Sequence, residues 1–138
     1  MLGEFFAARA EDIDDGLVEH GPYGRLRLVE AKGLTPVSLA TLGEILGAGT
    51  YDQLVEPISE GPAAESEEAG LLTIPTGFRD ALAEAKDLDI VAERWAATEE
   101  LSRDGWSAEE SREILGELSA LARNAAAESR ELWYWWSL

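Results

Sequence analysis

The chain has 138 residues, 46% of them hydrophobic, no cysteine and a formal net charge of −17 at pH 7. Its length and hydrophobic content fit one folded domain, and the lack of cysteine excludes disulfides, thiolate metal sites and cysteine nucleophiles. Acidic residues outnumber basic ones in both halves, so the surface repels nucleic acids and anionic membranes, and we expect neither as a partner.

The first part of the chain predicts a strand, a helix and a second strand. Residues 4–9 form a short segment that contains two phenylalanines, which favours a β-strand. Residues 10–20 place apolar side chains at helical spacing before a Gly-Pro pair. Residues 25–30 alternate charged and apolar side chains, which predicts a half-buried strand with Leu26 and Leu28 facing the core.

A second helix has a well-marked start, because Thr35 is a favourable N-cap and Pro36 suits the first helical position. Residues 51–58 are ambiguous, since their Leu-Val pair could also begin a strand. Residues 56–70 contain two prolines, two glycines and five glutamates. This composition predicts an exposed, mobile acidic loop.

The second half predicts one strand, three helices and a last strand. Residues 71–74 suit a buried strand and residues 76–85 a helix. A further helix begins at Asp87 or Asp89 and extends to about Arg103. The segment Ser107–Glu110 is a capping box, which opens a long amphipathic helix that ends near residue 129.

The C-terminal segment Leu132–Leu138 holds three of the five tryptophans. In a strand, its even-numbered and odd-numbered side chains face opposite sides, and both sets are apolar. This predicts a central strand, with helices on one face and Trp95 or Trp106 near the other.

The complete pattern predicts a single α+β domain over residues 1–138, with about four strands in a small mixed sheet and about five helices. No basic segment followed by an apolar run opens the chain, and no apolar run approaches the roughly 20 residues that span a bilayer. We therefore expect a cytoplasmic protein.

The sequence contains no recognisable catalytic, metal-binding or cofactor-binding set. His20 is the only histidine and lies at a predicted helix end, where it favours the helix dipole. Glu110, Glu113 and Glu117 share a helix face, but no Glu-x-x-His motif accompanies them, so we interpret them as solvated acids. No glycine-rich phosphate loop is present. We predict no catalytic residue, no metal and no cofactor.

Six residues are candidates for a binding site, which would combine aromatic rings with carboxylates. A buried indole needs an acceptor, and neighbouring glutamates could supply one. The alternative interpretation is packing of the C-terminal segment against two helices. The candidate residues are Trp95, Glu99, Glu100, Trp106, Trp133 and Trp135.

Three tryptophan motifs resemble those of a family of small bacterial proteins of uncharacterised function. They are W-A-A-T-E-E at residues 95–100, G-W at 105–106 and L-W-Y-W-W at 132–136. The resemblance covers roughly residues 23–138. It implies no activity and no functional residues.

Three functions remain open. The first is a protein-interaction module, in its most concrete form an inhibitor or immunity protein for a basic partner such as a nuclease toxin. The second is a small-ligand protein or enzyme that uses Glu99 and Glu100 near Trp95, which requires at least one of these acids to be buried in a cleft. The third is a homodimer joined through the C-terminal strand. Solubility alone, or a bias of the whole proteome, would also explain the acidic charge.

Overall fold

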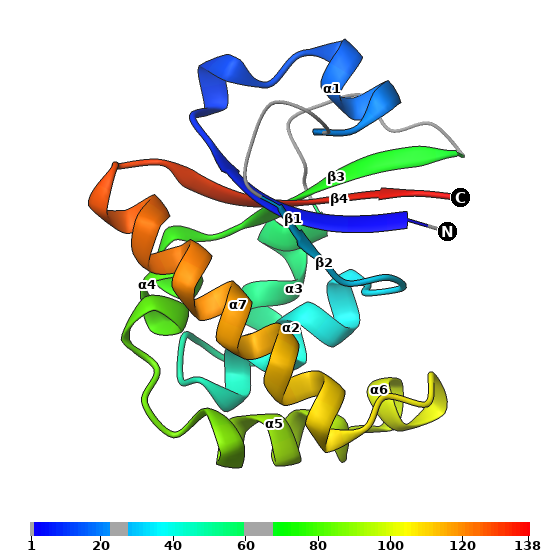
Figure 1. Ribbon diagram of the computed structural model, residues 1–138, viewed down its shortest axis with the longest axis vertical. Coiled ribbons are helices and arrows are strands. Elements are labelled where there is room, and N and C mark those ends of the chain that lie inside the picture. The colour runs from blue at the N-terminus through cyan, green and yellow to red at the C-terminus, as the bar shows by residue number, and fades with distance from the viewer. Residues whose placement is uncertain (1, 23–27, 60–67) are drawn as a thin grey trace.

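The C-terminal strand lies in the middle of a four-stranded sheet in the computed structural model, which describes residues 2–22, 28–59 and 68–138 (Figure 1). The strand order is β2-β1-β4-β3, and the described ranges also hold seven α-helices and one short 3-10 helix, η1. In chain order the elements are β1 (Leu2–Ala8), η1 (Ala10–Asp12), α1 (Asp15–His20), β2 (Leu28–Glu30), α2 (Pro36–Ile45), α3 (Tyr51–Ser59), β3 (Ala69–Ile74), α4 (Thr76–Glu84), α5 (Leu88–Ala96), α6 (Glu99–Arg103), α7 (Ala108–Ala127) and β4 (Glu131–Ser137).

The α+β class and the central position of the last strand are confirmed, but the prediction of a mixed sheet is wrong. All three pairings between the described strands are antiparallel. Ile74 at the end of β3 pairs with Leu132 near the start of β4. The helices between these strands therefore return the chain to the end of the sheet that it left, and β4 runs against β3.

The two faces of the sheet carry cores of unequal size. Helices α2 to α7 contribute to the main core on one face, whereas α1 covers the other (Figure 1). Leu132 and Tyr134 of β4 belong to the main core, and Trp133 and Trp135 belong to the smaller core beneath α1. The predicted alternation of two apolar faces in this strand is confirmed.

The predicted place of Trp95 and Trp106 is wrong. Both pack with the main core, on the same side of the sheet as Tyr134. The reason is that α5 and α6 lie against α7 and α2, which themselves cover that face. Helix α1 takes the place on the second face that these tryptophans were expected to fill.

Two glycines beside Trp136 make room for aromatic side chains of β4. Gly3 of β1 and Gly70 of β3 are the cross-strand partners of Trp136 on either side. A Cβ atom at Gly70 would lie 2.6 Å from indole atoms of Trp136. A Cβ atom at Gly3 would clash with the Tyr134 hydroxyl and lie 2.6 Å from the carbonyl oxygen of Ala31. Larger residues at these two positions would therefore displace Trp136 or Tyr134.

Local hydrogen bonds at helix starts confirm two of the predicted caps. The Thr35 hydroxyl accepts from the Ser38 amide at 3.2 Å, and the Ser38 hydroxyl accepts from the Thr35 amide at 2.9 Å. Pro36 follows as the first residue of α2. At the start of α7, the Ser107 hydroxyl accepts from the Glu110 amide at 3.0 Å, which confirms the cap. The predicted capping box is only half formed, because the Glu110 carboxylate accepts from the Ser107 hydroxyl at 3.1 Å and not from its amide. Such caps satisfy amides that have no partner within the helix.

Two differences raise the number of α-helices in the described ranges above the predicted five. Helix α3 forms where the sequence was ambiguous, because Thr50 and Gln53 cap each other's backbone amides at 3.2 and 3.0 Å. The helix predicted over residues 87–103 divides into α5 and α6. Thr98 adopts an extended backbone there, and its hydroxyl donates to the Trp95 carbonyl at 2.6 Å. Within the described part of the chain, no helix combines the length and apolar character that a membrane crossing requires.

Other predicted boundaries shift by a few residues. Residues 56–59 of the predicted loop complete α3, where Ile58 is buried, and residues 69–70 begin β3. Residues 60–67 of that loop, and residues 25–27 of the predicted second strand, lie outside the described residues.

The segment predicted as the first helix is also shorter than expected. Residues 10–12 form η1, and α1 starts only at Asp15. The start is set by Asp14, whose carboxylate accepts from the Leu17 amide at 2.7 Å. An aspartate N-cap of this kind fixes where a helix begins.

We predict that Gly3→Ala lowers the free energy of unfolding by about 1–3 kcal/mol, because the added methyl group meets Tyr134 and Ala31. Gly77→Ala is the matched control. A Cβ at Gly77 in α4 has no neighbour within 4 Å, so this change is neutral or stabilising by about 0.5–1 kcal/mol. Urea denaturation of both variants checks the prediction, and equal stabilities would contradict it.

Candidate functional site

Trp95 has a structural position in the main core. Its side chain is fully buried, and its indole N–H donates to the backbone carbonyl of Ser38 at 3.1 Å. The expectation that Glu99 or Glu100 accepts this hydrogen bond is therefore wrong. The ring centroid of Trp95 lies 6.4 Å from that of half-buried Trp106, so the structure brings these two candidates together.

The two predicted carboxylates do not line a buried cleft. The Glu99 side chain is 81% exposed, and its carboxylate lies 2.7 Å from the guanidinium of Arg103 one turn along α6. Glu100 is half-buried. A catalytic carboxylate with a perturbed pKa needs burial or a specific charged partner in a cleft. The ion pair of Glu99 lies at the surface, and neither Glu99 nor Glu100 lines any of the three hollows described below.

Trp133 and Trp135 lie on the opposite face of the sheet from Trp95 and Trp106. Their indole N–H groups donate to the backbone carbonyls of Ala8 at 2.9 Å and Val18 at 2.7 Å. The six candidates therefore do not form one aromatic and acidic pocket. The sheet separates them.

The C-terminal strand is also not available as a dimer edge. β4 pairs with β1 from Leu2 to Ala8 and with β3 from Ala69 to Ile74. Its backbone groups are used by its two neighbours within the same chain. The predicted route to a homodimer through this strand is wrong, because the strand lies inside the sheet and not at its edge.

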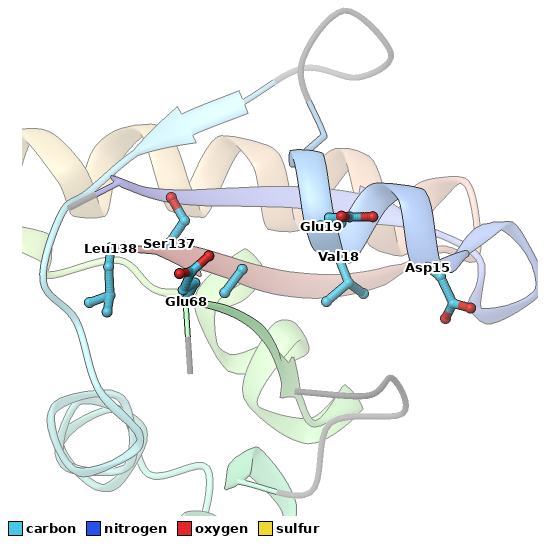
Figure 2. A pocket seen from close by; sticks show the side chains of 7 residues that line it. Asp15, Val18, Glu19, Glu68, Ser137 and Leu138 are labelled. Atoms are coloured by element: carbon cyan, nitrogen blue, oxygen red, sulfur yellow. The ribbon is translucent and has the colours of Figure 1, made fainter. Parts of the chain in front are cut away.

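The first hollow on the surface, which we call the α1 pocket, has a volume of about 520 Å³. Figure 2 shows Asp15, Val18 and Glu19 of α1 beside it, with Glu68, Ser137 and Leu138 at its other end. Its described lining carries three carboxylates and no basic side chain. No aromatic side chain belongs to this lining.

The second hollow lies between the edge strand β2 and helix α7, and we call it the β2–α7 groove. Its volume is about 570 Å³. Half-buried apolar side chains from both elements share this groove with exposed carboxylates. The lining residues are Leu28, Glu30, Ala31, Lys32, Trp106, Glu110, Glu113, Ile114 and Glu117.

A third hollow of about 570 Å³ lies between α2, α4 and α5 and also contains more acids than bases. An acidic lining is thus common to all three hollows and does not by itself mark a site. The β2–α7 groove differs because it combines the half-buried side chains of Trp106 and Ile114 with an edge of the sheet. We therefore take it as the candidate functional site. Of the six binding residues predicted from the sequence, Trp106 lines this groove.

The helical spacing of α7 concentrates negative charge along the groove. Glu110, Glu113 and Glu117 line it together, and acids four residues apart on a helix destabilise that helix by about 0.2–0.5 kcal/mol. Arg112 does not offset them, because its guanidinium contacts Asp89 of α5 at 2.7 Å. Across the groove, the Lys32 ammonium lies 3.9 Å from Glu30.

The groove has no features of a metal centre. Within the described residues, no group of three or more histidine, aspartate or glutamate side chains is placed to hold a metal ion. Every buried side-chain nitrogen and oxygen in the described ranges has a hydrogen-bond partner. What the groove offers chemically is an apolar surface with carboxylates at its rim.

Tyr134 holds the chain segment that follows β2 and borders the groove. Its hydroxyl donates to the Ala31 carbonyl at 2.5 Å and accepts from the Leu34 amide at 3.3 Å. Ala31 is itself a lining residue. The ring packs edge-on against Phe5 with centroids 4.7 Å apart. The centre of the sheet therefore fixes one wall of the groove.

Burial raises the pKa of the Tyr134 hydroxyl from 10.0 to about 12. The hydrogen bond from the Leu34 amide acts in the opposite direction and lowers this pKa, whereas the negative charge of Glu4 raises it. Removal of the proton would leave an anion in the main core without water to solvate it. Tyr134 therefore remains a neutral donor well above physiological pH.

Sequence reasoning missed most of the groove. The strand at Leu28 and Glu30 and the exposure of the three glutamates of α7 are confirmed, but their position around one groove was not predicted. The available signal was the common helix face of these glutamates together with Trp106 just before the helix. Nothing in the spacing shows that β2 lies opposite that face.

Comparisons of the chain with protein-family models, with curated proteins and with solved structures gave no match. The resemblance based on the tryptophan motifs therefore stays an expectation.

The raised pKa of Tyr134 predicts a specific loss of stability at high pH. Below pH 10 the hydroxyl is protonated in both the folded and the unfolded chain. As the pH rises from 10 to about 12, the unfolded chain releases this proton while the folded chain keeps it. The free energy of unfolding then falls by about 2–3 kcal/mol.

Urea denaturation of the natural chain and of Tyr134→Phe, followed over this pH range, measures the effect. Tyr134→Phe is less stable at neutral pH because two hydrogen bonds are lost. Its further loss of stability at high pH is smaller than that of the natural chain. Parallel pH profiles for the two proteins would contradict the assignment.

Proposed function

We propose that this protein is an interaction module that binds a basic protein partner in the β2–α7 groove. The observation that carries the proposal is the lining of this groove. It places the half-buried side chains of Trp106 and Ile114 beside four carboxylates and one ammonium group.

Charge complementarity supports a basic partner. The chain carries a formal net charge of −17, and a negative surface attracts positively charged proteins and accelerates their encounter. In the groove, Glu110, Glu113 and Glu117 repel one another along the same helix face. A lysine or arginine of the partner would relieve this repulsion and gain a charged hydrogen bond.

The apolar part of the groove supports binding of a protein segment over simple attraction of cations. Trp106 and Ile114 are each half-buried, so they still expose apolar surface that a partner can cover. Leu28 also borders the groove, but its side chain packs against the smaller core. Binding energy in protein interfaces is concentrated in a few such anchors, with aromatic side chains among the most frequent. The charges would then increase the rate of association and its specificity for a basic partner.

An inhibitor or immunity protein for a basic enzyme, such as a nuclease, is the concrete form of this function that the composition favours. An enzyme that acts on nucleic acid presents a positive surface to the phosphate backbone. A small acidic protein that covers this surface competes with the nucleic acid and is itself steered to it by charge.

A charge-reversal experiment tests the proposed site. The probe is a fluorescent nine-residue peptide of alternating lysine and valine, titrated with the protein at low ionic strength. We expect Glu113→Lys with Glu117→Lys to weaken binding at least tenfold, because both changes remove attraction at the groove. Added salt weakens binding by the natural chain as well, since the charges are exposed.

Glu56→Lys with Glu93→Lys is the matched control. Both residues are exposed, on α3 and α5, and the two replacements change the net charge by the same amount. We expect this variant to bind the peptide within about twofold of the natural chain, apart from the general effect of charge. Equal weakening by the two double variants would show attraction to the protein as a whole and would overturn the groove as the site.

A further inference from the structure

We propose that the partner segment binds in an extended conformation, as an additional β-strand on the open edge of β2. The segment would carry lysine or arginine at alternate positions. This inference rests on the proposed function, and it specifies how the β2–α7 groove recognises its partner.

The hydrogen-bond pattern shows which backbone groups of β2 face outward. The Ala31 amide donates to the Gly3 carbonyl of β1 at 2.9 Å. In an antiparallel pair the N–H and C=O groups of one residue point to the same side, and this side alternates along the strand. Val29 therefore faces β1, whereas the backbone groups of Leu28 and Glu30 point away from it.

The outward side of β2 opens into the groove. β2 stands at one end of the strand order, and in the described part of the chain it pairs with β1 alone. Leu28 and Glu30, whose backbone groups face outward, both line the groove. An added strand would find a row of donors and acceptors there, as in other cases of strand addition to a sheet edge.

The other edge of the sheet is less suited to a partner. β3 is buried at nearly every position, and both α1 and α3 contact it. In β2, by contrast, Glu30 is exposed and Leu28 is half-buried. β2 is thus the more accessible of the two edges.

The spacing of the carboxylates on α7 fits an extended segment. Glu113 and Glu117 are four residues apart, which is about 6 Å along a helix. Side chains on one face of a strand are about 6.6–6.8 Å apart. Two alternate basic residues of the added strand would therefore reach carboxylates along α7, and their aliphatic stems would lie over Trp106 and Ile114.

A helical segment is the other basic occupant that such a groove could accept. A helix satisfies its own backbone groups internally, so it would leave the outward groups of Leu28 and Glu30 unused. An extended strand uses both these groups and the carboxylate row. The edge of β2 therefore favours the strand.

Backbone methylation of the probe peptide tests this inference. One peptide of alternating lysine and valine is N-methylated at its lysines, and a second at its valines, while the charge is unchanged. In an added strand only alternate amides face β2. We expect one methylated peptide to bind at least tenfold more weakly than the unmethylated peptide, and the other to bind within about threefold of it.

Equal affinity of all three peptides would overturn strand addition and leave the proposed function intact, because binding would then depend on side chains alone. Equal weakening by both methylation patterns would also overturn strand addition, because this is the result expected of a peptide that binds as a helix. The proposed function itself is overturned in two cases: if the unmethylated peptide does not bind, or if it binds the groove variant as well as it binds the natural chain. Glu113→Lys with Glu117→Lys weakens all binding peptides, which identifies the groove as their common site.

Discussion

Strand β4 hydrogen-bonds to β1 along one side and to β3 along the other, and the remaining structure depends on this double pairing. Its alternate side chains fill two different cores, with Leu132 and Tyr134 on the side of α7 and Trp133 and Trp135 beneath α1. A fully buried large apolar side chain contributes about 1.5–3 kcal/mol. One strand therefore joins both layers of helices to the sheet.

The same strand also determines where the candidate site lies. The Tyr134 hydroxyl reaches past β1 to the segment after β2, where it binds Ala31 and Leu34. Gly3 is needed between them because a side chain there would occupy the space of the hydroxyl. The wall of the groove is thus fixed by the centre of the sheet, while its opposite wall is the exposed face of α7. A rigid edge and a charged helix face suit recognition of an extended basic segment.

Features that depend on a few neighbouring residues could be predicted from the sequence. The caps at Thr35 and Ser107 and the two apolar faces of the last strand are of this kind. The antiparallel order could not be predicted, because it depends on where the helices between β3 and β4 return the chain. The site could not be predicted either, since β2 and the segment around Trp106 come to border one groove only in the folded chain. Candidates chosen for their chemistry, such as Trp133, proved to be core residues with backbone partners.

Deletion of residues 131–138 tests most directly whether β4 holds the two layers together. The account predicts that the shortened chain loses its cooperative thermal transition, measured by far-ultraviolet circular dichroism, because β1 and β3 lose their shared partner and both cores open. Deletion of Leu138 alone, which is 72% exposed, serves as the control and leaves the Tm nearly unchanged. A cooperative transition of the shortened chain at the Tm of the intact protein would contradict the account.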